Sequence, residues 1–93
     1  MKFLITGAAG FIGYSISEYL LKKKNIQIVG IDNFSNYSGK DIKRLRIKIL
    51  KKNKNFKFYK VDIKNKSNVK KFFSKYYFTY VIHLAAEVGV RYS

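Results

Sequence analysis

The stretch KFLITGAAGFIG, residues 2–13, decides the fold of this chain. It opens with a short apolar run, Lys2–Thr6, that has the length and composition of a buried strand. Three glycines follow at the spacing G-x-x-G-x-x-G, and apolar residues then recur at helical spacing. A glycine-rich turn placed directly between a strand and a helix is typical of the phosphate-binding loop of dinucleotide-binding α/β domains.

Each glycine of this turn has an expected role. Gly7 permits the tight turn that leaves the strand, Gly10 lets the backbone approach a pyrophosphate, and Gly13 lets the helix pack closely on the sheet. The helix N-terminus adds free N–H groups and a partial positive charge. The alternative is a glycine-rich turn without a ligand. We expect the loop to bind a dinucleotide through Gly7, Ala9, Gly10, Phe11, Ile12 and Gly13.

Strands and helices alternate along the rest of the chain. Short apolar runs predict strands at Ile26–Ile31, Phe56–Val61 and Thr79–Leu84. Helical spacing predicts helices between them: from Phe11 to the lysine run before Asn25, from Lys40 to Lys52, and from the N-cap Ser67 to about Tyr76. The order β-α-β-α-β-α-β predicts an α/β fold, a Rossmann-type doubly wound parallel sheet with the strand order 3-2-1-4.

Periodicity also predicts which side chains face the core. The expected apolar faces are Phe11, Ile12, Ser15, Ile16, Tyr19 and Leu20 in the first helix, Ile42, Leu45, Ile49 and Leu50 in the second, and Val69, Phe72, Phe73 and Tyr76 in the third. Lysines at positions 57 and 60 predict that the third strand is an exposed edge. The fourth strand is almost entirely apolar, which predicts that it lies covered inside a sheet. No element follows that would cover it, so we expect residues 1–93 to be a partial dinucleotide-binding domain, the fragment of a longer protein.

Two aspartates stand where strands end. Asp32 lies nineteen residues after Gly13, where an acidic residue accepts hydrogen bonds from the adenosine ribose, and Asn33 is expected to assist. Because a carboxylate repels a 2′-phosphate and no arginine adjoins it in the sequence, NAD is favoured over NADP. The alternative role for Asp32 is to cap the loop instead of binding the ribose. Asp62 and Ile63 are expected at the adenine ring, and a turn-capping aspartate is an equally good interpretation.

Composition excludes several classes of function. The net charge of +15 comes mostly from lysines at helix ends and on polar faces, and no nucleic-acid-binding motif accompanies it, so we expect no nucleic-acid partner. The absence of cysteine excludes disulfides and thiol catalysis, and a single histidine excludes a histidine metal cluster. The lack of cysteine also fits a cytoplasmic protein. No apolar run approaches the ~18 residues that span a membrane, so we expect no membrane partner.

The segment VIHLAAEVGVRYS, Val81–Ser93, narrows the family. It resembles the V-I-H-L-A-A-Q-A-G-V-R-Y-S segment of UDP-glucuronate 4-epimerases, which belong to the NAD-dependent epimerase/dehydratase family of extended short-chain dehydrogenases/reductases. The resemblance includes Gly30–Asn33 upstream and covers the chain from Thr6 to Ser93. Glu87 and Val88 depart from the pattern, and related dehydratases carry glutamate at the position of Glu87.

This resemblance implies an NAD-dependent isomerase that inverts C4 of a UDP-hexuronate through transient oxidation to a 4-keto sugar. It implies that the cofactor is lined by Leu84, Ala85 and Ala86, and the sugar nucleotide by Gly89, Val90 and Arg91; a surface cation is the alternative for Arg91. The full-length enzyme is expected to be a homodimer. A nucleotide-sugar 4,6-dehydratase and a non-catalytic NAD-binding module remain alternatives.

The catalytic groups of such enzymes are a Tyr-x-x-x-Lys pair on a later helix, with a serine or threonine before it. The sole match here is Tyr19 with Lys23, in the first helix, where we expect Tyr19 to face the sheet and serve packing. The catalytic pair is therefore expected beyond Ser93, and the chain alone is expected to be inactive. His83 lies in an apolar strand and is expected to be a buried, hydrogen-bonded structural residue rather than a general base.

Overall fold

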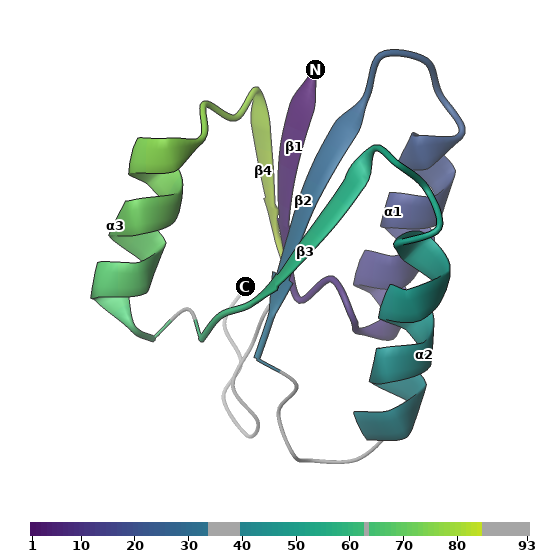
Figure 1. Cartoon of the computed structure of the whole chain (residues 1–93), viewed down its shortest axis with the longest axis horizontal. Coiled ribbons are helices and arrows are strands. Elements are labelled where there is room, and N and C mark those ends of the chain that lie inside the picture. The colour runs from purple at the N-terminus through teal and green to yellow at the C-terminus, as the bar shows by residue number, and fades with distance from the viewer. Residues whose placement is uncertain (34–39, 63, 85–93) are drawn as a thin grey trace.

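The structure is a computed structural model that describes residues 1–33, 40–62 and 64–84. Its strands are β1 (Lys2–Thr6), β2 (Gln27–Asp32), β3 (Phe56–Lys60) and β4 (Tyr80–His83), and its helices are α1 (Phe11–Leu21), α2 (Lys40–Leu50) and α3 (Lys66–Lys75). The strands form one parallel sheet in the order β3-β2-β1-β4 (Figure 1). The predicted Rossmann-type fold and strand order are confirmed.

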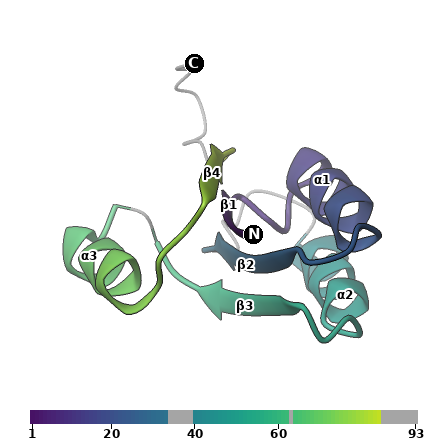
Figure 2. The ribbon, with the colours of Figure 1, turned by 90° about the horizontal axis from the view of Figure 1, so that it is seen from above.

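The helices cover the two faces of the sheet unequally. Helices α1 and α2 lie on one face and α3 lies on the other (Figure 2). Thr6, the last residue of β1, pairs with Ile31 of β2 and with His83 of β4. The carboxyl ends of these three strands therefore meet at one edge of the sheet, which is where ligands bind in open α/β sheets.

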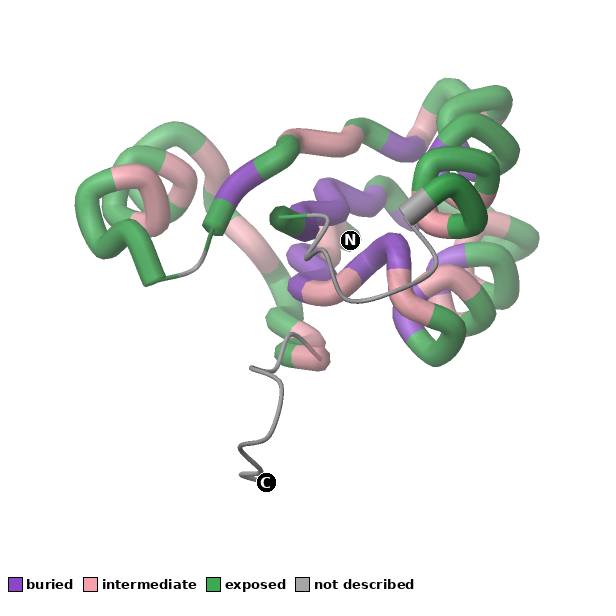
Figure 3. Tube along the Cα trace, turned by 90° about the horizontal axis from the view of Figure 1, so that it is seen from below, coloured by how far each residue is buried: buried purple, intermediate pink, exposed green. Residues whose placement is uncertain are grey.

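The core has one layer on each face of the sheet, because neighbouring residues of a strand point to opposite faces. Ile5 and Ile28 pack toward α1 and α2, in a cluster that includes Ile47, Leu50 and Phe56. The opposite face packs toward α3, with Leu4, Val29, Ile31 and Val61 buried against Tyr59, Phe72, Tyr76 and Phe78. Burial is concentrated in β1 and β2, the central strands (Figure 3).

The predicted buried face of α1 is correct for Ile16 and Leu20, which pack against the core, and wrong for Phe11, Ile12, Ser15 and Tyr19. Phe11, Ile12 and Tyr19 are 70%, 59% and 60% exposed, whereas Gly13 and Ser17 are buried. A Cβ atom on Gly13 would lie 2.2 Å from the Gly7 carbonyl oxygen. The small residues thus allow the helix backbone to approach the loop closely, and they occupy buried positions in place of Phe11, Ile12 and Tyr19. The helix ends at Leu21 with Lys22 as its C-cap, before the predicted stop at Asn25, which instead has a positive φ of 64° in the turn before β2.

The predicted stripe of α2 is also largely wrong. Ile47 and Leu50 are buried, whereas Ile42, Leu45 and Ile49 are exposed. Ile47 and Leu50 are the α2 residues in the buried core cluster on the α1 side of the sheet. It ends at Leu50, two residues before the predicted Lys52.

Helix α3 begins earlier than predicted. Its N-cap is Asn65, whose side chain accepts a hydrogen bond from the Asn68 backbone N–H, so the prediction of Ser67 as N-cap is wrong. Asn65 is the N-cap because its extended backbone lets the side-chain oxygen reach the Asn68 N–H group. Phe73, predicted to face the core, is 51% exposed.

The two outer strands are the edges of the described sheet, as the predicted order 3-2-1-4 places them. Strand β3 was also predicted to be an edge from its lysines. In the apolar strand β4, Tyr80 and Val81 are 53% and 49% exposed. Among the described residues, no helix is long and apolar enough to cross a membrane.

Candidate dinucleotide-binding site

The glycine-rich loop leaves β1 and is tied to the end of β2. Gly7 adopts a φ of 73°, which an L side chain rarely tolerates. The Gly7 and Ala8 N–H groups both donate to the Ile31 carbonyl oxygen, at 2.9 and 3.2 Å, and the Gly10 N–H donates to the Gly7 carbonyl at 3.1 Å. These bonds close a compact turn whose position is determined by both central strands.

Helix α1 starts from this turn with its N-terminus uncapped by any side chain. Gly10 is the N-cap, and it has no side-chain hydrogen bond to the first turn. A Cβ atom on Gly10 would meet only the Gly7 carbonyl oxygen, at 3.4 Å, which is an ordinary contact. The surroundings of Gly10 are thus open, and the N–H groups of Phe11–Gly13 belong to a helix end that can bind an anion.

Asp32 is brought against the loop. Its carboxylate is buried, with 6% of the residue exposed, and Oδ2 accepts a hydrogen bond of 3.0 Å from the Ala9 N–H. The fold therefore joins the acidic residue and the phosphate loop that the sequence identified separately. This bond also gives Asp32 the loop-capping role that the sequence left open, so its contact with a ribose stays a prediction.

Two basic residues of α2, Lys43 and Arg46, lie beside Asp32 and Ala9, and the sequence analysis identified neither as a site residue. Lys43 Nζ lies 3.8 Å from Asp32 Oδ1. Arg46 Nη1 donates to the Ala9 carbonyl oxygen at 3.1 Å, and its guanidinium carbon lies 5.9 Å from the centre of the Phe11 ring. No arginine adjoins Asp32 in the sequence, but the crossover helix places one beside the same loop residue. The available signal was the i, i+3 spacing, which puts Lys43 and Arg46 on one face of α2.

A hydrogen-bonded link joins β1 to the end of β4. The Thr6 hydroxyl lies 2.8 Å from His83 Nδ1 and accepts from the Leu84 N–H at 2.9 Å. Leu84, predicted to line the cofactor, is thereby held at the same edge as the loop. His83 is hydrogen-bonded, as predicted, but it is exposed rather than buried because β4 is an edge strand.

The other predicted site residues either are exposed or lie outside the described residues. Asp62 is exposed, and its side chain accepts from the Lys64 N–H at 2.9 Å, which supports the turn-capping interpretation and leaves its contact with adenine a prediction. Asn33 is exposed directly after Asp32. The remaining predicted residues lie outside the described ones: Ile63, Ala85, Ala86, Gly89, Val90 and Arg91.

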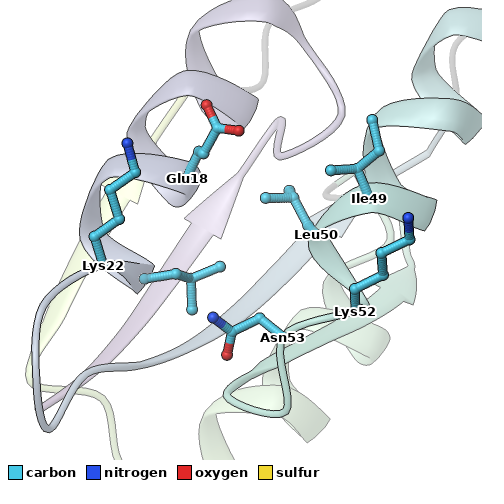
Figure 4. Close-up of a pocket in the computed structure, with 7 residues that line it drawn as sticks. Glu18, Lys22, Ile49, Leu50, Lys52 and Asn53 are labelled. Carbon is cyan, nitrogen blue, oxygen red and sulfur yellow. The ribbon is translucent and has the colours of Figure 1, made fainter.

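The far end of α1 has no connection with this site. A pocket of about 330 Å³ lies there between the C-terminal ends of α1 and α2, and it is lined by Glu18, Leu21, Lys22, Ile49, Leu50, Lys52 and Asn53 (Figure 4). Tyr19 is exposed and Lys23 Nζ lies 4.7 Å from the centre of its ring, so the prediction that Tyr19 faces the sheet is wrong. Tyr19 lies more than two helical turns from the loop, which gives this Tyr-x-x-x-Lys match no place in the site.

Comparison with known proteins assigns the family. The model of the GDP-mannose 4,6 dehydratase family matches residues 4–93. The chain belongs to this family. The UDP-glucuronate 4-epimerase of Thermodesulfobacterium geofontis is a curated relative of this family member. It is 45% identical to the chain over 89 residues, or 96% of the chain. UDP-glucuronate 4-epimerase 2 of Arabidopsis thaliana is 42% identical over 97% of the chain. The chain spans 27% and 20% of the lengths of these two relatives.

Solved structures agree with the fold of this family member. UDP-glucuronic acid 4-epimerase from Bacillus cereus, in complex with UDP-glucuronic acid and NAD, matches with a TM-score of 0.83 and 41% identity, over 98% of the chain and 28% of that protein. The dTDP-glucose 4,6-dehydratase from Bacillus anthracis, in complex with NAD, matches with a TM-score of 0.79 and 25% identity, over 94% of the chain and 27% of that protein.

Proposed function

We propose that the chain is the NAD-binding portion of a nucleotide-sugar epimerase that inverts C4 of a UDP-hexuronate. The observation that carries the proposal is the hydrogen bond from the Ala9 N–H to Asp32. It joins a buried carboxylate, the partner of ribose hydroxyls, to a loop of the kind that binds pyrophosphate. The adenosine ribose and the pyrophosphate are neighbours in NAD, so one edge of the sheet can bind both.

The residues present fit the cofactor. The open surroundings of Gly10 leave room for a pyrophosphate, and the uncapped N-terminus of α1 offers N–H donors and positive potential to it. Asp32 would accept from the ribose hydroxyls. The exposed Phe11 and Ile12 offer apolar surface beside the loop. When bound, NAD supplies the hydride acceptor and donor, while these residues hold and orient it.

The substrate part of the proposal is supported by the relatives. The two curated relatives above are UDP-glucuronate 4-epimerases, and the B. cereus enzyme binds UDP-glucuronic acid together with NAD. The sugar-binding role of Gly89, Val90 and Arg91, the homodimer and the cytoplasmic location remain predictions. The Tyr-x-x-x-Lys catalytic pair is likewise expected outside this chain.

A 4,6-dehydratase is the second candidate, because the family model carries that name and a dehydratase is a structural neighbour. The two are distinguished by the products that a full-length protein containing this chain forms from UDP-glucuronate and from a UDP-hexose. An epimerase converts UDP-glucuronate to its C4 epimer with the carboxylate intact, which proton NMR identifies by the coupling of H4. Loss of water from the UDP-hexose, whose C6 hydroxyl group can leave, without turnover of UDP-glucuronate would contradict the epimerase proposal, and so would no turnover of either sugar.

Cofactor binding is tested on the chain itself by isothermal titration calorimetry with NAD. We expect saturable binding, and we expect Gly10→Ala to weaken it by roughly 10-fold or more, because the new methyl group would displace the pyrophosphate from its donors. Glu18→Ala, at the far end of α1, is the control and should leave the affinity unchanged. Absence of NAD binding by a folded chain would refute the proposal.

A further inference from the structure

Arg46 contacts the glycine-rich loop from α2, unlike the other arginine of this helix. It is partly buried, whereas Arg44 is exposed. Its Nη1 donates to the Ala9 carbonyl oxygen at 3.1 Å, and its guanidinium carbon lies 5.9 Å from the centre of the Phe11 ring. One side chain therefore connects α2 both to the loop and to the first residue of α1.

The Ala9 carbonyl belongs to the peptide unit that leads into Gly10, the N-cap of α1. On the other side of this planar trans unit, the Gly10 N–H donates to the Gly7 carbonyl oxygen at 3.1 Å. A hydrogen bond thus holds each side of the unit, one from within the loop and one from α2. The Ala9 N–H belongs to the preceding unit and donates to Asp32 at 3.0 Å. With Arg46 in place, both peptide units before the helix are hydrogen-bonded.

The orientation of the Ala9–Gly10 peptide unit matters for an anion at the N-terminus of α1. A carbonyl oxygen turned toward the pyrophosphate would repel it, whereas the N–H groups of the helix attract it. The guanidinium group holds the Ala9 oxygen toward α2 by a charge-assisted hydrogen bond and opposes its partial negative charge. Because Gly10 has no side chain to cap the first turn, the geometry of the loop decides how these N–H groups are presented.

We propose that Arg46 is a positioning residue for the cofactor pyrophosphate, and that it acts through the Ala9–Gly10 peptide unit rather than by contact with the phosphates. This inference rests on the proposed dinucleotide site. A guanidinium group suits this place because it donates to the carbonyl while its planar face lies near Phe11. A lysine would keep the charge and one hydrogen bond but lose the planar contact.

Arg46→Met tests the proposal, and Arg44→Met is the matched control because it removes the same charge from the exposed side of the same helix. Isothermal titration calorimetry measures NAD binding, and circular dichroism checks that each variant is folded. We expect Arg46→Met to weaken NAD binding roughly 10-fold, the scale of one hydrogen bond to a charged group, and Arg44→Met to leave it unchanged. Arg46→Lys should bind NAD more tightly than Arg46→Met, and Arg46→Gln replaces Arg46→Met if that variant does not fold.

Two further measurements distinguish positioning from a purely structural role. NMR titration gives the affinities for ADP, which has the pyrophosphate, and for adenosine, which lacks it. Partial unfolding would weaken both equally, so we expect the ratio of the two affinities to fall roughly 10-fold in Arg46→Met and to stay constant in Arg44→Met. In the unliganded chain, Arg46→Met should accelerate solvent exchange of the Gly10 amide proton but not that of Ile28, which is bonded within the sheet.

The outcomes separate this inference from the proposed function. If the folded wild type binds neither NAD nor ADP, the proposed function fails, and this inference fails with it. If the wild type binds NAD and the two methionine variants bind it alike, or if ADP and adenosine lose affinity equally, the inference is overturned while the proposed function stands. Loss of ADP affinity without a change at the Gly10 amide would also overturn it, because Arg46 would then act by touching the phosphates.

Discussion

At the scale of single residues, the smallest side chains determine where α1 lies. Gly13 and Ser17, one helical turn apart, are buried where the helix meets the loop and the sheet. Gly10 lies in the same loop but in open surroundings. The two glycines therefore serve different purposes, one for packing and one for the approach of a ligand, and substitution separates these purposes.

Gly13→Ala is expected to destabilise the chain by about 2–3 kcal/mol, the upper range for overpacking, because its methyl group would lie 2.2 Å from the Gly7 carbonyl oxygen, a backbone atom that cannot move aside. Urea unfolding measures this loss. Gly10→Ala is the matched control, and it should leave the free energy of unfolding within about 0.5 kcal/mol of the wild type. Equal losses in the two variants would contradict the separation of roles.

Ser17 has a hydroxyl group that is buried without a hydrogen-bond partner. Burial of an unpaired hydroxyl costs about 1–3 kcal/mol, so Ser17→Ala is expected to stabilise the chain by about 1 kcal/mol. The exposed Ser15 lies in the same helix, and Ser15→Ala corrects for the higher helix propensity of alanine. The thermal midpoints of the two variants are compared; a Ser17→Ala midpoint no higher than that of Ser15→Ala would show that the hydroxyl group is satisfied.

At the scale of elements, α3 depends on the cap that starts it. Asn65→Ala removes the acceptor for the Asn68 N–H and is expected to cost about 1 kcal/mol of stability. Ser67 lies inside the first turn, so Ser67→Ala should cost nothing. Chemical denaturation of both variants gives the comparison. The opposite order of losses would mean that the helix begins at Ser67 in solution.

Strand β3 and the C-cap residue of α3 are joined by an aromatic contact that is sensitive to alkaline pH. The Tyr59 hydroxyl lies 2.6 Å from the Tyr76 hydroxyl. This hydrogen bond, and then burial, raise the pKa of Tyr59 above its ordinary value of 10.0. A raised pKa means that the neutral phenol is favoured in the folded state, so its contribution to stability is present below pH 10 and is lost as pH rises through the raised pKa.

Tyr59→Phe is therefore expected to reduce the loss of stability between pH 9 and pH 11. The free energy of urea unfolding at the two pH values gives this loss for wild type and variant, and their difference removes the contribution of the lysines. Tyr77→Phe is the control, because Tyr77 is 91% exposed. An equal pH dependence in the wild type and Tyr59→Phe would contradict the raised pKa.

At the scale of the whole molecule, charge opposes folding. The chain carries 20 lysines and arginines against 5 acidic residues, a net charge of +15, and like charges repel more strongly in the compact state. Added salt screens this repulsion, since the Debye length falls from about 30 Å at 0.01 M to about 10 Å at 0.1 M.

Raising sodium chloride from about 0.01 M to 0.1 M, the interval over which the Debye length falls, is therefore expected to stabilise the chain. A gain of about 1 kcal/mol corresponds to roughly 4–8 °C in the midpoint of thermal unfolding for a domain of this size. Calorimetric scans at both salt concentrations measure it, with an equal osmolarity of sucrose as the control for excluded-solute effects. A midpoint that falls with salt would mean that attractive ion pairs outweigh the repulsion.

The sequence by itself determined the order of elements, the parallel sheet and the position of the phosphate loop. These depend on local information: apolar runs such as Lys2–Thr6, the glycine spacing that begins at Gly7, and the alternation of strands with helices. Strand β3 was recognised as an edge for the same reason, because Lys57 and Lys60 are visible among the apolar residues of one segment.

The tertiary structure alone decided which face of each helix is buried and what surrounds Asp32. Periodicity places Tyr19 and Ile42 on apolar stripes, but both are exposed, because Gly13 and Ser17 occupy the buried positions of α1 and Ile47 and Leu50 those of α2. Lys43 reaches Asp32, and Arg46 reaches Ala9 of the loop, only because the crossover connection returns α2 to the edge of the sheet where Asp32 lies. Side-chain contacts between elements far apart in the sequence depend on packing, which no local pattern encodes.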